Sequence, residues 1–171
     1  MNAPHLIRPA VAADAPAIHA LICELADYEK MSADVVSTPE MISDSLASGH
    51  AEAQLAEIDG APVGFALFFH NYSTFLGRPG IYLEDLYVQP AHRGCGIGKS
   101  LLLSVTDIAR ERGCQRMDWT VLDWNQPSIE FYESLGAKIQ REWLLVRLDA
   151  DALARLDCAG ALTRLPLCDD H

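Results

Sequence analysis

The stretch "HRGCGIGKS", residues 92–100, has the residue types and spacing that most directly suggest chemistry. Its end, Gly98-Lys99-Ser100, is typical of a nucleotide-binding P-loop. That motif, however, requires glycine five positions before Gly98, where this chain has Arg93. The dinucleotide-binding spacing also fails, because Gly94, Gly96 and Gly98 each lie two positions apart. The stretch therefore predicts neither of these nucleotide sites.

The same glycines are suited to holding an anion. Alternating glycines let the backbone approach a ligand closely and turn several N–H groups in one direction. The helix expected after them, over residues 101–112, adds free N–H donors and the positive end of its dipole, and Arg93 and Lys99 supply formal charge. We predict a pyrophosphate site at this loop; a glycine-rich turn without a ligand is the alternative.

The elements around this loop alternate between strands and helices. Apolar residues recur at helical spacing over residues 14–30, Thr38-Pro39 begins a second helix, and Asp59-Gly60 predicts a tight hairpin turn. Strands are expected over residues 5–10, 52–58, 62–69, 81–88, 116–122 and 141–148, with a loop over 71–80 and a short helix ending at Gly136. This order predicts one α/β domain over residues 1–171.

Composition limits the class of protein. The chain has 171 residues, half of them hydrophobic, and a net charge of −11. Such a chain suits one core and a surface that repels nucleic acid and anionic membranes while favouring small cations, although the charge can also serve solubility alone. No leader or membrane-spanning run is visible and the five cysteines lack zinc-ligand spacing. We therefore expect a cytoplasmic protein with reduced thiols and no metal.

Residues Arg93 to Gly98 resemble the acyl-CoA loop of the GNAT N-acetyltransferases, Gln/Arg-x-x-Gly-x-Gly/Ala. The chain is most similar to the diamine acetyltransferase branch, the spermidine/spermine and thialysine N-acetyltransferases. The matching segments are "IRPAVAADAPAIHALICELADYEKM", "YSTFLGR", "YLEDLYVQPAHRGCGIG" and "VLDWNQPSIEFYESLGA". The resemblance implies the GNAT fold, which is α/β with a central mixed, mostly antiparallel twisted sheet flanked by helices. It also implies a homodimer and acetyl-CoA as co-substrate, whereas residues 149–171 are a divergent C-terminal tail that does not match the family.

The resemblance also implies which residues hold acetyl-CoA. The backbone of one strand would pair with the pantetheine arm, the glycine loop would hold the pyrophosphate, and the start of a later helix would contact the cofactor. This set is Leu86, Tyr87, Val88, Arg93, Gly94, Cys95, Gly96, Ile97, Gly98, Lys99, Asn125, Gln126, Pro127, Ser128 and Leu135.

Acetyl transfer to an amine requires a proton to leave, because neutralising an ammonium with a pKa of about 10.4 costs about 4.6 kcal/mol at pH 7. Glu84 and Asp85 are adjacent on an expected strand and should point to opposite faces. The resemblance assigns to Glu84 the attraction of the cation and acceptance of its proton. It assigns to Tyr132 protonation of the departing thiolate, and a backbone N–H near Tyr87 is expected to stabilise the oxyanion. A surface position for Glu84 and core packing for Tyr132 are the alternatives.

The amine acceptor is expected to meet aromatic and acidic side chains. The resemblance implies Tyr28, Glu29, Glu84, Asp118, Trp119 and Thr120 as substrate-binding residues. Tyr72 is followed by Ser73-Thr74, where the spermidine/spermine enzymes have Asp-Pro, so an acidic contact for a distant ammonium is missing. We therefore expect thialysine, lysine-like amines or short diamines to be better substrates than spermidine or spermine.

Two other functions stay open. A P-loop nucleotide-binding protein is disfavoured by Arg93 and by the glycine spacing. A GNAT-fold protein that binds CoA as a sensor or partner module, without amine turnover, is disfavoured by the presence of Glu84 and Tyr132.

Overall fold

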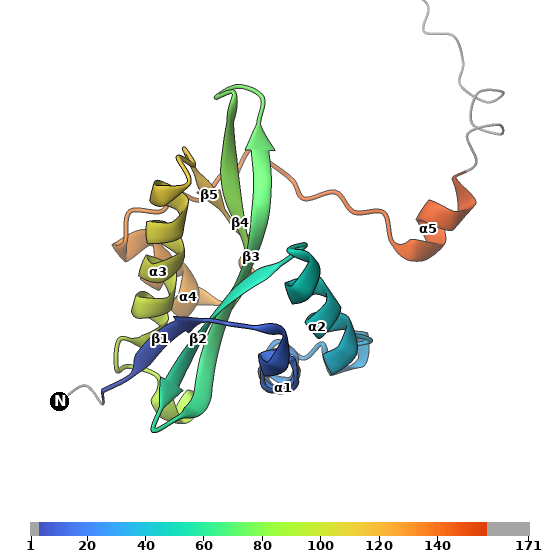
Figure 1. Ribbon diagram of the computed structural model, residues 1–171. Helices are drawn as coiled ribbons and strands as arrows, with labels where there is room; N and C mark the ends of the chain where they lie inside the picture. Colours follow the sequence, from blue (N-terminus) through green and yellow to red (C-terminus); the bar gives the residue numbers. More distant parts are fainter. Residues whose placement is uncertain (1–3, 157–171) are drawn as a thin grey trace, which may run out of the picture. The chain divides into compact units, whose positions relative to one another are not determined.

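The computed structural model describes residues 4–156 of the chain (Figure 1). The chain divides into two compact units, Met1–Thr120 and Val121–His171. One domain over residues 1–171 stays a prediction. Within residues 4–156, no helix is long and apolar enough to cross a membrane.

The first unit is built on a five-stranded sheet with the strand order β1-β2-β3-β4-β5. The first four strands pair antiparallel, and β5 runs parallel to β4. The predicted mixed, mostly antiparallel sheet is therefore confirmed. The strands are β1 Leu6–Pro9, β2 Glu52–Ile58, β3 Ala61–Ser73, β4 Arg78–Val88 and β5 Met117–Asp118.

Helices lie on both faces of this sheet, α1 and α2 on one side and α3 on the other (Figure 1). Ile18 of α1 packs with Leu55 and Phe65 in the buried core, whereas Ser104 of α3 donates a hydrogen bond to Gln54 at 3.1 Å. We call these two sides the α1 face and the α3 face. The helices are α1 Ala15–Glu29, α2 Pro39–Ser48 and α3 Ile97–Glu111, with short 3₁₀ turns η1 Ala12–Asp14, η2 Ser32–Asp34 and η3 Pro90–His92.

Local signals set the end of β2 and both ends of α2 as predicted. The Thr38 side chain accepts a hydrogen bond from the Met41 N–H at the start of α2, and Gly49 ends this helix with a φ of 73°. Asp59 and Gly60 have φ values of 52° and 79°. Both values lie in the left-handed region, which a two-residue type I′ hairpin turn requires.

The hairpin of β3 and β4 is longer than predicted. Residues 71–80 were expected to form a loop, but Asn71 pairs with Gly80 and Ser73 pairs with Arg78, so only four residues turn at the tip. The turn is tight because the Ser73 Oγ accepts a hydrogen bond from the Leu76 N–H at 3.2 Å. Ser73 is buried, and its side chain serves the turn.

The end of the sheet is shorter than predicted. Residues 116–122 were expected to form a strand, but only Met117 and Asp118 pair with β4. Residues 141–148 were also expected to form a strand, and the structure shows no strand there. A strand forms only where a neighbour completes its hydrogen bonds, and no described residue pairs with this segment. Its apolar residues, including Trp143 and Leu144, are exposed.

The second unit contains two helices, α4 Gln126–Ser134 and α5 Ala150–Arg155. The helix α4 is the predicted short helix through Tyr132. The Asn125 side chain accepts a hydrogen bond from the Ser128 N–H at its start, and Asp149 caps α5 in the same way through the Ala152 N–H. Of the predicted tail, residues 157–171, which include Cys158 and Cys168, lie outside the described residues.

Candidate active site

Strand β4 carries a bulge at the pair of carboxylates that the sequence singled out. Asp85 pairs with Leu67, and Leu83 pairs with the next residue of β3, Phe68. Glu84 is therefore an extra residue without an opposite partner. Since Leu67 and Phe68 point to opposite faces, Leu83 and Asp85 do as well, although they are two residues apart. Strict alternation along β4 therefore stops at the bulge, and Asp85 lies on the face opposite to Leu83. The opposite orientation of Glu84 and Asp85 stays a prediction.

The bulge places Asp85 on the α1 face. Leu67 and Phe65 on β3 belong to the core cluster beneath α1, and Asp85 and Tyr87 stand opposite them. Glu29, the last residue of α1, is near enough for its negative charge to act on Asp85. Glu84 is exposed, whereas Asp85 and Glu29 are half-buried.

Asp85 has the most perturbed pKa of a carboxyl in this site. Burial, followed by the negative charges of Glu84 and Glu29, raises its pKa from 3.8 to about 7. Burial also raises the pKa of Glu29. A carboxyl that titrates near neutral pH can both accept and release a proton under working conditions, as a general base must. The resemblance assigns proton acceptance to Glu84, and that assignment stays a prediction. The burial of Asp85 was not expected, because it depends on residues that are distant in the sequence, such as Glu29.

The edge of β4 that faces away from β3 pairs with β5 at only two residues. The rest of this edge has no partner strand among the described residues. Only Ile81 and Tyr82 pair with β5. The Gln89 N–H donates to the Val63 carbonyl of β3, and in an antiparallel pair the direction of the backbone groups alternates. The backbone groups of Leu86 and Val88 therefore point to the free edge, while those of Tyr87 point to β3. At this edge we infer that Leu86 offers its N–H and carbonyl and Val88 its N–H, because the Val88 carbonyl accepts a hydrogen bond from Arg93. The contact of all three residues with the cofactor stays a prediction.

The glycine loop leads directly into α3. Gly94 and Gly96 have φ values of 76° and 86°, which explains the requirement for glycine, and a side chain at Gly94 would meet nothing within 4 Å. The helix begins at Ile97, earlier than predicted, and no side chain caps it. The N–H groups of its first turn, through Lys99, are therefore available to an anion in front of the helix.

Arg93 connects the loop to α1 and β4. Its Nε donates to the Val88 carbonyl at 2.8 Å, and its Cζ lies 4.7 Å from the ring centroid of Tyr28 and 5.5 Å from that of Tyr87. Glu24 of α1 accepts hydrogen bonds from the same side of β4, from the Tyr87 hydroxyl at 3.2 Å and the Gln89 amide at 2.9 Å. Arg93 and Tyr28, predicted as cofactor and substrate residues respectively, thus contact each other.

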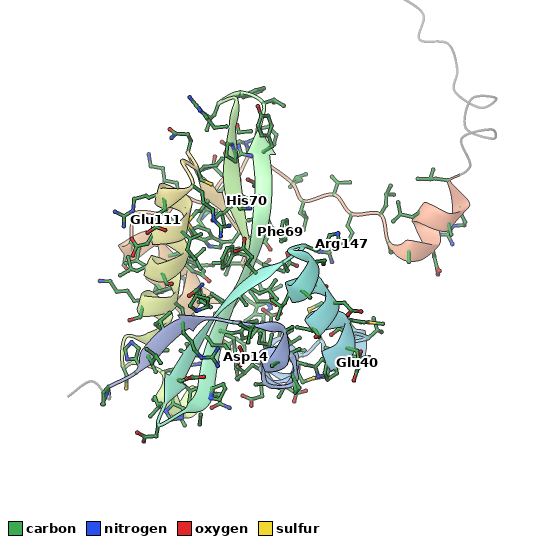
Figure 2. All side chains as sticks on the ribbon, in the orientation of Figure 1. Asp14, Glu40, Phe69, His70, Glu111 and Arg147 are labelled. Carbon is green, nitrogen blue, oxygen red and sulfur yellow. The ribbon has the colours of Figure 1, made fainter. Side chains whose placement is uncertain are left out.

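A second polar group lies on the α1 face where β5 joins the sheet. The Asn71 Nδ2 donates to Asp118 Oδ2 at 3.0 Å, and Arg116 Nε contacts the same oxygen at 2.8 Å. Tyr82, which pairs with Asp118, stacks on Phe69 with ring centroids 5.3 Å apart. Figure 2 shows Phe69 and His70 on opposite sides of β3, as alternation requires.

The remaining predicted residues lie elsewhere or in the second unit. Cys95 and Gly98 are half-buried in the loop and α3, Trp119 is half-buried and Thr120 is exposed. In the second unit, Tyr132 is buried beside Phe131, with ring centroids 5.3 Å apart. Asn125 is buried at the start of α4, Gln126 and Pro127 are exposed in its first turn, Ser128 is half-buried, and Leu135 is exposed at its end.

The structure thus brings together three groups of predicted residues in the first unit. In the first group, Glu29 and Glu84 are near enough for their charges to act on Asp85. The second group is the free edge of β4 together with the uncapped start of α3. The third is Asp118, farther along the α1 face. The described residues contain no group of three or more His, Cys, Asp or Glu side chains that could hold a metal ion.

Comparison with known proteins finds a family match and close relatives. The model of the Acetyltransferase (GNAT) family matches residues 19–137. A thialysine N-epsilon-acetyltransferase of Bos taurus is 38% identical, over 88% of this chain and 96% of its own length. An L-ornithine N5-acetyltransferase of Arabidopsis thaliana is 44% identical over 58% of this chain and 43% of its own length. An integron cassette protein from the mobile metagenome of V. cholerae shares the fold, with a TM-score of 0.73 and 23% identity over 96% of this chain and 99% of its own.

Proposed function

Since the chain belongs to the GNAT acetyltransferase family and acts as an acetyltransferase on amines, we propose that its acceptor is a primary amine of a small cationic substrate. Thialysine, a lysine-like amine or a short diamine fits best. The observation that carries this proposal is Asp85, a half-buried carboxyl with a pKa of about 7 beside Glu84 and Glu29. Their negative charge favours an ammonium group.

GNAT acetyltransferases use acetyl-CoA, and the features of the first unit fit its chemical groups. The uncapped first turn of α3, with the loop glycines and Lys99, suits the pyrophosphate. The free edge of β4 at Leu86 and Val88 suits the amides of the pantetheine arm. When bound, acetyl-CoA supplies the acetyl thioester. From the family resemblance we add Asn125 to Ser128 and Leu135 as contacts.

Glu84 and Asp85 have different roles in the deprotonation of the ammonium. Glu84, which is exposed, attracts the incoming ammonium, and Asp85, which is half-buried, accepts its proton. The approach of the cation lowers the pKa of Asp85 and so favours its ionised, proton-accepting form. The nitrogen lone pair is then free to form the C–N bond with the acetyl carbon.

The departing thiolate needs a proton, and the Tyr132 hydroxyl is the proposed donor. A phenol with an ordinary pKa of about 10 is protonated at pH 7 and can give its proton as the C–S bond breaks. The N–H of Leu86 or Val88, at the free edge of β4, would stabilise the negative charge on the acetyl oxygen. The nitrogen that has formed the C–N bond loses its second proton, which restores the Tyr132 hydroxyl, and the proton on Asp85 leaves to solvent. The products are then an N-acetylated amine and CoA as a free thiol.

The substrate class follows from the carboxylates and from the relatives. Thialysine and L-ornithine, named for two relatives, each carry a side-chain amine on an amino acid. Ser73 is buried in the hairpin turn and its side chain offers no negative charge to a distant ammonium. We therefore propose that spermidine and spermine are poorer substrates. A homodimer is proposed on the family resemblance alone, and a cytoplasmic location on the scattered cysteines, which suit reduced thiols.

A thiol-release assay tests this function. Purified protein with acetyl-CoA is given thialysine, lysine, ornithine, putrescine, spermidine, spermine and an amino-terminal peptide in turn. We expect release of CoA with the amino acids or short diamines above the rate without an acceptor. Binding of acetyl-CoA without release for any amine would instead support a CoA-binding sensor or partner module.

A further inference from the structure

The polar group formed by Asn71, Arg116 and Asp118 lies apart from the three carboxylates at the bulge. Asp118 pairs with Tyr82 on β4, and Arg116 is two residues earlier on the chain, so both lie on the α1 face with Asp85. Tyr82 pairs with Phe69 and Asp85 pairs with Leu67, so the bulge leaves the two positions only two β3 residues apart, which at about 3.3 Å per residue is about 7 Å along the strand.

Gly80 makes this group possible. Asn71 stands opposite Gly80, and its side chain crosses over that glycine from β3 to reach Asp118 on β5. A Cβ at Gly80 would lie 2.4 Å from Asn71 Oδ1 and 3.2 Å from the Cγ of Arg116. The absence of a side chain at Gly80 thus lets both Asn71 and Arg116 lie across the strand.

The group keeps unused hydrogen-bonding capacity. Asn71 and Arg116 both contact Oδ2 of Asp118. In the part of the chain that the structure describes, Asp118 Oδ1 and the two terminal nitrogens of Arg116 have no further partner. Both side chains are 42% exposed, so a ligand can reach them. A planar guanidinium fork beside a carboxylate oxygen complements a carboxylate beside an ammonium.

We propose that Arg116 and Asp118 bind the α-carboxylate and the α-ammonium of a basic amino acid whose side-chain amine is acetylated. Asn71 is a positioning residue that holds Asp118 through Oδ2. The stacked rings of Phe69 and Tyr82 lie between this pair and Asp85 and offer an apolar surface to the methylene chain. A lysine-like side chain extends about 6 Å from its Cα. The side chains of Arg116 and Asp118 at one end and of Asp85 at the other span the remaining distance.

This inference rests on the proposed function and narrows it to amino acids. A polyamine carries no carboxylate for Arg116, so it gains nothing from the guanidinium and meets its positive charge. The structure thereby distinguishes lysine from cadaverine, which has the same amine and chain but lacks the α-carboxylate.

The test compares kcat/KM for lysine and cadaverine in wild type and in Arg116→Gln. We expect wild type to prefer lysine, and Arg116→Gln to lower the lysine-to-cadaverine ratio of kcat/KM by about tenfold or more. The matched control is Arg110→Gln, because Arg110 lies on α3 and pairs only with its exposed neighbour Asp107 among the described residues. Its ratio should equal that of wild type.

Two further variants keep the test decisive. Arg116→Lys retains the charge without the fork and should give an intermediate ratio, and it replaces Arg116→Gln if that variant does not fold. Asn71→Ala should raise KM for lysine more than it lowers kcat. A wild-type enzyme that uses cadaverine as well as lysine, or a ratio unchanged in both Arg116 variants, would overturn the proposed binding of the amino acid by Arg116 and Asp118 while leaving amine acetylation intact. Absence of turnover with every amine would instead overturn the proposed function.

Discussion

The Asn71 amide donates to the carboxylate of Asp118 across the full width of strand β4, at 3.0 Å. Neighbouring strands lie about 4.8 Å apart, so a contact between β3 and β5 must pass over a residue of β4. Here that residue is Gly80. The contact joins the short strand β5, which pairs through only two residues, to the long hairpin.

Gly80→Ala should therefore destabilise the protein. The new Cβ would lie 2.4 Å from Asn71 Oδ1 and 3.1 Å from the backbone oxygen of Arg116, and the backbone cannot easily move. We expect the free energy of unfolding to fall by about 1–3 kcal/mol, as measured by urea denaturation. Gly98→Ala is the matched control, because its Cβ would meet only the Val88 side chain at 3.8 Å. Equal stability of Gly80→Ala and wild type would show that Asn71 does not depend on this glycine.

Lys99→Glu should separate helix stability from cofactor binding. A negative charge in the first turn of α3 favours the helix dipole, so the melting temperature should not fall. The same charge repels a pyrophosphate, so we expect the Kd for acetyl-CoA to rise about tenfold or more. Lys138→Glu changes the net charge equally at an exposed site in the second unit and should leave the Kd unchanged. Calorimetry measures both values, and an unaltered Kd in Lys99→Glu would argue against the α3 site.

Tyr132→Phe removes the proposed acid and keeps the ring. Turnover should fall by about 10²-fold or more, while the Kd for acetyl-CoA changes little. Phe131→Leu is the control for packing, because the two rings are neighbours on α4. A Tyr132→Phe enzyme with wild-type kcat would leave Tyr132 as a core residue, which is the alternative that its burial also allows.

Asp85→Asn should stabilise the protein above neutral pH. The pKa of Asp85 is raised from 3.8 to about 7, so the folded protein binds more protons than the unfolded chain between these values. The contribution of Asp85 to the free energy of unfolding is therefore greatest below pH 3.8 and falls as the pH rises through 7. The free energy of unfolding of Asp85→Asn should exceed that of wild type by more at pH 8 than at pH 4. We expect this change in the difference to be about 2 kcal/mol, after allowance for solvent screening. Thermal melts across pH measure this, and a gain that does not depend on pH would contradict the raised pKa.

Much of the fold could be predicted from local signals in the sequence. The N-cap at Thr38 and the turn at Asp59-Gly60 depend on residues within a few positions of one another, and the structure confirms both. The long hairpin was missed because Ser73, in place of a longer loop, closes a tight turn. The strand predicted over 141–148 needs a partner strand, and composition alone does not reveal where one is absent.

The candidate site was predicted less completely, for a related reason. The glycine loop is continuous in sequence, so its conformation and the uncapped start of α3 could be expected. The role of Asp85 depends on a bulge, which arises from the register between two strands, and on Glu29 from a distant helix. The group of Asn71, Gly80 and Arg116 likewise forms only when three strands come together.

The pH dependence of kcat/KM tests most directly whether Asp85 accepts the proton. The assay uses the best amine acceptor with wild type, Asp85→Asn and Glu84→Gln. Wild-type kcat/KM should rise with pH through an acidic limb with an apparent pKa of about 7. Asp85→Asn should lose about 10²-fold in kcat/KM together with that limb, and Glu84→Gln should keep the limb, shifted to lower pH because a neighbouring charge is removed. An Asp85→Asn enzyme with wild-type kcat/KM and an unchanged limb would contradict the assignment and return the role of base to Glu84.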